Sequence, residues 1–256
     1  MIKFFRRIRQ SLINENRMGK YFKYAIGEIL LVVIGILIAL QVNNWNNKRL
    51  ERKKEQTILI NLRSDFNENL AEYNRIYESS TESYKSSIKL LEIIKGDSEI
   101  NPLEIEVLLN SICNGFYSLD LNAASIDEIK SSGSLNIIED GELRKQISKW
   151  SFMVADTEDD IEIYYNYLFE FLFPSLTNKS VLRNMAVPRR LQGVGNLSQI
   201  TKSNLSVDYN DTLRNLEIEN QLYNHTLNLV FVLQAYENIE AYLNSTLKMI
   251  EANIND

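Results

Sequence analysis

The sequence contains one histidine, His225, and one cysteine, Cys113, which together could form a Cys–His pair for nucleophilic catalysis. A Cys–His dyad would require them to meet in space, and nothing in their spacing indicates that they do. A di-iron site in a helical bundle needs a glutamate three residues before a histidine, but that position is Leu222. Phosphate-binding loops and zinc-ligand spacings are also absent from the sequence. We therefore expect no enzymatic activity, no cofactor and no metal.

Carboxylates and tyrosines form two further clusters, at residues 156–162 and at Tyr164, Tyr165 and Tyr167. The first, DTEDDIE, could bind a divalent cation weakly, but it also has the pattern of a solvated acidic helix face, which is the interpretation we adopt. The tyrosines could line a small-ligand pocket. Because their positions are heptad-like, we interpret them as core and interface residues instead.

The composition predicts that helices position these residues. The 256 residues include three prolines and nine glycines, which is little material for the frequent tight turns of an all-β fold. The predicted fold class is all-α, with a single N-terminal transmembrane helix that continues into a stalk and an antiparallel, coiled-coil-like helical bundle.

An apolar stretch at residues 24–45 predicts the transmembrane helix. Its first nineteen positions contain only Glu28 and Gln41 as polar residues. At helical rise they span roughly 28 Å, close to the thickness of a bilayer core. Tyr21 and Tyr24 at one end and Trp45 at the other are placed as membrane-interface anchors. A cleaved signal peptide is the competing interpretation, but the preceding region is long and no small-x-small cleavage site follows Leu40.

The basic residues predict the orientation of this helix. Seven Lys or Arg precede it and five follow it closely, so the positive-inside rule places residues 1–23 in the cytoplasm. Residues 46–256 then form a periplasmic domain of a protein of the bacterial inner membrane. Residues 55–256 carry a net charge of −15, which argues against nucleic acid as a partner, whereas the basic N-terminal part suits a lipid bilayer.

Two features of the N-terminal part leave alternatives open. Residues 1–13 alternate apolar and basic side chains at helical spacing, which fits either a helix lying in the membrane interface or an unstructured charged flank. Glu28 either extends back towards the headgroups or faces a helix interface. Gly27, Gly35 and Ala39 lie on nearly the same face of the predicted helix, and small residues there allow helix backbones to approach closely. We therefore predict that Gly27, Glu28, Gly35 and Ala39 form a transmembrane oligomer interface.

Caps and breakers divide the remainder into helices. The first predicted helix ends at Gly96, and the second extends from the Asn101 cap to about Asn114. The third is capped by a Ser125–Glu128 box and ends at Gly133. The fourth extends from the Asp140 cap to Pro174, and the fifth covers residues 212–253. Residues 177–208 are predicted to be a long loop. The apolar face predicted for the last helix comprises Leu216, Tyr223, Leu227, Val230, Leu233, Ile239, Leu243, Leu247 and Ile250.

Two stretches of the sequence resemble a known family. They are MIKFFRRIRQSLINENRMGKYFKYAIGEILLVVIGILIALQVNNWNNKR at the N-terminus and SIDEIKSSGSLNIIEDGELRKQI downstream. Both are similar to the proteins called domain of unknown function 6090, found in marine flavobacteria. The resemblance implies a membrane-anchored helical protein of unassigned activity. Asn46–Asn47 stands where relatives commonly have Asn–Glu.

These observations favour a non-enzymatic function. We expect a homo-oligomeric, membrane-anchored periplasmic scaffold or interaction protein that binds another protein of the cell envelope. One alternative is a ligand-sensing bundle that signals through a partner, because the twenty-three residues before the span are too few for a signalling domain. Another is a small ion-conducting oligomer that uses Glu28.

Overall fold

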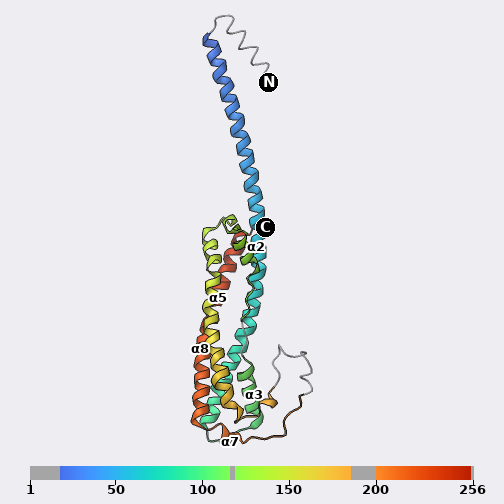
Figure 1. Cartoon of the computed structure of the whole chain (residues 1–256), viewed down its shortest axis with the longest axis vertical. Coiled ribbons are helices and arrows are strands. Elements are labelled where there is room, and N and C mark those ends of the chain that lie inside the picture. Colours follow the sequence, from blue (N-terminus) through green and yellow to red (C-terminus); the bar gives the residue numbers. More distant parts are fainter. Residues whose placement is uncertain (1–17, 116–118, 186–199, 255–256) are drawn as a thin grey trace. The chain divides into compact units, whose positions relative to one another are not determined.

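A computed structural model describes residues 18–115, 119–185 and 200–254. These residues form helices and connecting segments without a β-strand, which confirms the all-α prediction (Figure 1). Residues 1–13, for which the interfacial helix was considered, lie outside the described residues. The elements are α2 (Met18–Lys95), α3 (Pro102–Asn114), α4 (Ala124–Ser131), the 3-10 helix η1 (Ser134–Ile137), α5 (Gly141–Tyr167), the π-helical turn η2 (Leu168–Leu172), α6 (Phe173–Thr177), the 3-10 helix η3 (Leu182–Asn184), α7 (Tyr209–Thr212) and α8 (Leu216–Asn253).

The chain consists of two compact units, Met1–Thr57 and Ile58–Asp256, and the boundary between them falls inside α2. Helix α2 is continuous from Met18 to Lys95, so the apolar segment continues into the helical domain without a break, as predicted. The predicted stop is also confirmed, because Gly96 directly follows the last helical residue.

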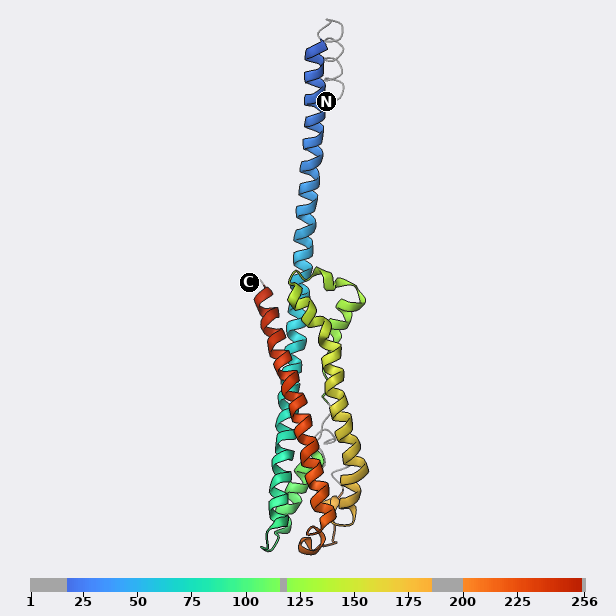
Figure 2. The ribbon, with the colours of Figure 1, turned by 90° about the vertical axis from the view of Figure 1, so that its left-hand side faces the viewer.

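In the second unit, α5 and α8 run antiparallel over most of their length (Figure 2). Near one end the Tyr242 hydroxyl donates to the Gln146 carbonyl, and near the other the Tyr167 hydroxyl donates to the Gln221 carbonyl at 2.6 Å. The part of α2 beyond Ile58 also runs antiparallel to α8, and the Tyr73 hydroxyl donates to Glu240 Oε2 at 2.9 Å. These contacts confirm the predicted antiparallel helical bundle.

The core of the bundle consists of apolar side chains from α2, α3, α5 and α8. Trp150 of α5 is 1% exposed and lies between two other rings, with centroids 5.1 Å from Phe66 of α2 and 5.9 Å from Tyr242 of α8. Other fully buried members are Leu59, Leu62, Ile76, Leu90, Ile105, Leu109, Ile112, Leu143, Ile147, Leu222, Leu229, Ile239, Leu243 and Ile250. Burial of this apolar surface is the main stabilising contribution to the unit.

Two helix starts follow their predicted caps. The Asn101 side chain accepts from Leu103 N at 3.0 Å, and the Asp140 side chain accepts from Glu142 N and Leu143 N. Glu104, in the first turn of α3, pairs with Lys89 Nζ at 2.6 Å. That ion pair joins α3 to the last part of α2.

The capping box predicted at Ser125 is wrong, because α4 begins at Ala124 and its cap position is Ala123. Asn122 Oδ1 accepts from Ala124 N at 2.9 Å, and Asp65 Oδ2 of α2 accepts from Ser125 N at 2.9 Å. Asn69 adds two more bonds: its Nδ2 donates to the Asn122 carbonyl and its Oδ1 accepts from Asn122 N. Helix α2 therefore caps α4, which leaves Ser125 inside the first turn.

The end predicted at Pro174 is also wrong, because α6 continues to Thr177. The preceding turn, η2, is π-helical, and Phe173 N donates to the Leu168 carbonyl five residues earlier. Proline lacks an N–H and clashes with the carbonyl four residues before it in a regular helix. The wider π turn places Pro174 at the start of a new α-helical register, where both conflicts are relieved. Of the predicted loop at 177–208, the described part contains only the short helix η3.

The last predicted helix is interrupted near its start. The described chain forms the short α7 and then, after Leu213–Asn215, the long α8. Asn215 is the cap of α8, since its side chain accepts from Ile218 N at 3.1 Å. The predicted apolar face is correct from Ile239 onwards but not in the first half of α8, where Leu216, Tyr223, Leu227 and Val230 are exposed.

Candidate functional site

The apolar part of α2 is exposed on all sides. Among the described residues one helix is long and apolar enough to cross a membrane, and none of its apolar window is buried in the protein. The large apolar side chains from Phe22 to Trp45 are between 44% and 64% exposed. A core helix of a soluble protein has similar length and composition but is mostly buried. The structure therefore contains a long, uncovered apolar helix near the N-terminus, of the kind found in membrane anchors and signal sequences.

The glycines of this helix are not explained by contacts within the described chain. A Cβ added at Gly27 or at Gly35 would meet no atom within 4 Å. By contrast, a Cβ at Gly115, in the bundle, would lie 2.4 Å from Ser83 Cβ, so that glycine is required by close packing. What Gly27 and Gly35 offer is a flat surface that another helix can approach closely.

A shallow hollow surrounds Gly27 on the helix surface. It is lined by Lys23, Tyr24, Gly27, Glu28 and Leu31. Lys23 and Leu31 lie one turn to either side of the glycine, whose missing side chain creates the hollow. Leu31, Gly35 and Ala39 continue the row at intervals of four residues, so the small residues and the carboxylate of Glu28 lie on one side of the helix.

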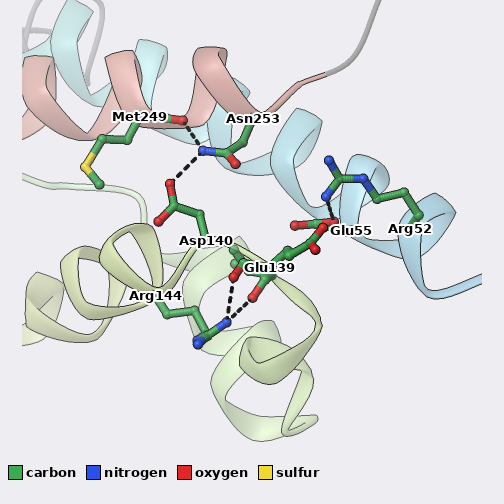
Figure 3. A network of polar contacts seen from close by, with 8 residues as sticks. Arg52, Glu55, Glu139, Asp140, Arg144, Met249 and Asn253 are labelled. Atoms are coloured by element: carbon green, nitrogen blue, oxygen red, sulfur yellow. Dashed lines mark hydrogen bonds and ion pairs between the residues drawn. The ribbon is translucent and has the colours of Figure 1, made fainter. Parts of the chain in front are cut away.

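The predicted interface anchors lie at the two ends of the apolar segment. Tyr24 and Trp45 are exposed, and the Arg49 guanidinium lies 6.0 Å from the centroid of the Trp45 ring, within the range of a cation–π contact. The side chain of Tyr21 lies outside the part that the structure describes. Further along the first unit, Arg52 pairs with Glu55 one turn later (Figure 3).

His225 and Cys113, the two candidates for chemistry, are both in the interior of the bundle. His225 is fully buried, and its ring lies 5.6 Å from the ring of Tyr164. Within the described residues, neither ring nitrogen of His225 nor the Tyr164 hydroxyl has a hydrogen-bond partner. Burial lowers the pKa of His225 to about 3 and raises the pKa of Cys113 to about 12, so both are neutral at pH 7. A protonated thiol is a weak nucleophile, so the arrangement is that of a packed core.

The acidic run at residues 156–162 is a solvent-exposed face of α5, as we interpreted it. Asp156, Glu158, Asp159 and Glu162 are exposed, whereas Thr157 and Ile161 point into the bundle. In the described residues no group of three or more His, Cys, Asp or Glu side chains is arranged to hold a metal ion.

A polar network connects the start of α5 to the end of α8 (Figure 3). Asp140, the cap of α5, accepts through Oδ2 from Asn253 Nδ2 at 3.0 Å, and Asn253 also donates to the Met249 carbonyl. The hydrogen bond from Asn253, followed by those from the backbone of α5, lowers the pKa of Asp140. Arg144 donates to the carbonyls of Ile138 and Glu139. These bonds connect the two helix ends, so we assign the network a role in holding them.

A comparison with protein families gives a match to a family of unknown function, DUF6090, over residues 28–154. The chain belongs to the DUF6090 family. The match confirms the family expected from the sequence and adds no activity. No curated protein and no solved structure matches this chain.

The DUF6090 match divides the candidate residues into two groups. Glu28, Gly35, Ala39 and Trp45 lie within it, together with α3, α4 and the first half of α5. Gly27, the second half of α5 and the whole of α8 lie outside it. His225 and the exposed apolar residues of α8 are therefore features of this DUF6090 protein beyond the matched region.

Proposed function

We propose that this DUF6090 protein is a homo-oligomeric scaffold or interaction protein, anchored in the bacterial inner membrane by one helix, with its helical bundle in the periplasm. The observation that carries the proposal is the fully exposed apolar window of α2. Leaving so many apolar side chains in water is unfavourable by about 25 cal/mol for each Å² of apolar surface, so lipid is the environment that fits them.

The charges on either side of the apolar segment support the proposed orientation. Seven basic residues precede it and five follow it closely, and the side with more Lys and Arg tends to stay in the cytoplasm. The second unit, Ile58–Asp256, has 16 basic and 30 acidic residues, a net charge of −14. Such a domain is repelled by anionic headgroups and phosphate backbones, which favours a protein partner.

The open surface around Gly27, Gly35 and Ala39 supports self-association. Lipid chains are as apolar as leucine side chains, so helices associate in a membrane mainly through close packing and hydrogen bonds. The glycines allow close packing, and a carboxyl group at Glu28 gains from a protein partner in this environment. Both features lie on one side of the helix, as an interface requires.

The oligomer is tested by replacing Gly35 with leucine in the full chain. We expect wild type to run as an oligomer in mild detergent and Gly35→Leu to shift towards monomer, because the added side chain separates the backbones. Val33→Leu, on the opposite side of the helix, is the matched control and should leave the mass unchanged. Light scattering coupled to size-exclusion chromatography measures the mass. A monomeric wild type, or a Gly35→Leu variant of unchanged mass, would show that this interface is wrong.

The orientation is tested by protease treatment of intact spheroplasts from a bacterium that produces the full chain with a C-terminal epitope tag. We expect the protease to remove the tag and most of the bundle without lysing the cells. A cytoplasmic marker protein should survive in the same samples, as a control for intact membranes. Protection of the tag until detergent is added would contradict the periplasmic placement.

A further inference from the structure

The first half of α8 is apolar on two opposite sides. One side carries Ile218, Leu222, His225, Leu229 and Val232, all buried in the bundle. The other carries side chains that are between 41% and 73% exposed, and we call them the outer strip: Leu216, Tyr223, Leu227, Val230 and Phe231. Large apolar side chains gathered on one exposed side of a helix are typical of a surface that another molecule covers. The outer strip therefore has the composition of a contact surface.

From Tyr223 to Phe231 the outer strip lies in a stretch of α8 without charged residues, whereas the exposed Glu217 and Glu219 lie beside Leu216 at its start. Residues 220–236 form the longest run without Asp, Glu, Lys or Arg outside the apolar N-terminal segment. At helical rise these seventeen residues extend over about 25 Å. Within residues 220–236, the exposed polar side chains beside the outer strip are the amides Asn220, Asn224 and Gln234. Aromatic residues combined with a depletion of charge are typical of the buried centre of a protein–protein interface.

The charge of the second unit indicates which partner this surface fits. Two copies of a domain with a net charge of −14 repel each other wherever carboxylates face one another. From Tyr223 to Phe231 the outer strip offers a surface without carboxylates, on which two copies can meet without that repulsion. A basic partner would instead be attracted to the acidic faces, such as the one at residues 156–162 of α5.

The amides beside the outer strip point to the same partner. An amide contains both a donor and an acceptor, so asparagine or glutamine can pair with the identical residue of a second copy. A carboxylate or an ammonium group cannot. Symmetric dimers bring the same patch of both subunits together and therefore require self-complementary groups of this kind.

We propose that the outer strip of α8 docks against the same strip of a second copy of this chain. The contact rests on the proposed homo-oligomer and adds an interface within the helical domain. Its function is to join the domains of neighbouring copies independently of the small residues in the apolar helix.

Disulfide trapping of the full chain in native membranes tests this contact. Leu227→Cys is introduced into a Cys113→Ala background, so that it is the sole thiol. We expect oxidant to form disulfide-linked dimers about tenfold or more faster than with the control, because docking raises the effective concentration of the partner thiol. Phe152→Cys is the matched control, an exposed apolar residue on α5. Trapping should accelerate at higher salt, which screens the repulsion between the acidic domains.

Three outcomes would overturn the proposal. They are equal trapping at both positions, trapping at Leu227→Cys that slows with added salt, and a disulfide to a different protein in place of the homodimer. A Val230→Cys variant repeats the test at a second position of the outer strip, and circular dichroism confirms that each variant is folded.

Adding Gly35→Leu to the trapping variant tests the outer strip independently of the proposed interface in the apolar helix. Continued trapping in that variant would support the outer strip even if the proposed helix interface fails. Suppose that neither Leu227→Cys nor Val230→Cys forms trapped dimers, while wild type still has the mass of an oligomer in detergent. That result would refute the contact through the outer strip and would still support the proposed homo-oligomer.

Discussion

Replacement of Trp150 by alanine is expected to destabilise the helical domain by about 3–5 kcal/mol. The indole is almost completely buried and packs against the rings of Phe66 and Tyr242, so it joins α5 to both α2 and α8. Its removal loses apolar burial and two aromatic contacts and leaves a cavity where three helices meet. A domain of this size is usually stable by about 5–15 kcal/mol, so the loss is a large fraction of the total.

Urea unfolding of the full chain in mild detergent, followed by circular dichroism at 222 nm, measures the effect on Trp150→Ala. Phe152→Ala is the matched control, because Phe152 is an aromatic residue two positions later that is 70% exposed. We expect its effect to stay within about 0.5 kcal/mol. A loss below about 1 kcal/mol for Trp150→Ala would show that the three helices do not depend on this packing.

The periodicity of apolar residues predicted the long helices well, because each helix has to bury at least one side. It failed where a helix has two apolar sides. Leu216, Tyr223, Leu227 and Val230 recur at the spacing of a buried face, and so do Ile218, Leu222 and Leu229 on the opposite side. Only the positions of α2 and α5 decide which of the two faces the core. The exposed face was therefore wrongly assigned to the core.

Helix ends were predicted correctly where the capping hydrogen bonds join residues close in the sequence, and incorrectly where they join residues far apart in the sequence. Asn101 and Asp140 bond to backbone groups two or three residues later, which a sequence pattern can reveal. The carboxylate that bonds to Ser125 N belongs to Asp65, sixty positions earlier. The π turn before Pro174 depends on how the end of α5 packs, and no residue type marks it.

The candidate membrane-spanning segment could be predicted from the sequence, because it is recognised by the length and composition of one apolar stretch. Residues 24–45 are apolar over a bilayer-sized distance, and this does not depend on the rest of the fold. The environment of His225 was not accessible in this way. Its burial depends on Tyr164 and on helices that precede it by more than fifty residues, so the sequence alone identified a histidine but not its charge state.

His225 is expected to make the domain less stable in mild acid. Burial lowers its pKa to about 3, whereas an unfolded chain has the ordinary value of 6.5. Between these values the unfolded state binds a proton that the folded state does not. Stability therefore falls as the pH drops below 6.5 and stops falling, for this residue, near pH 3. From pH 7.5 to pH 5.0 the free energy of unfolding should decrease by about 2 kcal/mol on this account.

The neighbours of His225 do not offset this effect. Tyr164, in contact with its ring, is neutral because burial raises the pKa of its hydroxyl well above the usual value. Cys113, which lies near Tyr164, is likewise uncharged at neutral pH. A proton on the imidazole would thus meet neutral side chains, and the folded state has to open to accept it.

Comparison of wild type with His225→Leu isolates this contribution, because the chain has no other histidine and its carboxylates titrate in both proteins. At pH 7.5 we expect the two to differ by no more than about 1 kcal/mol, since the lost contact with Tyr164 is offset by removing two ring nitrogens without partners. When the pH is lowered from 7.5 to 5.0, the difference in free energy of unfolding between variant and wild type should shift by about 2 kcal/mol in favour of the variant. Parallel urea curves at the two pH values measure it. Identical pH dependence in both proteins would mean that the imidazole reaches a proton donor or solvent while the bundle remains folded.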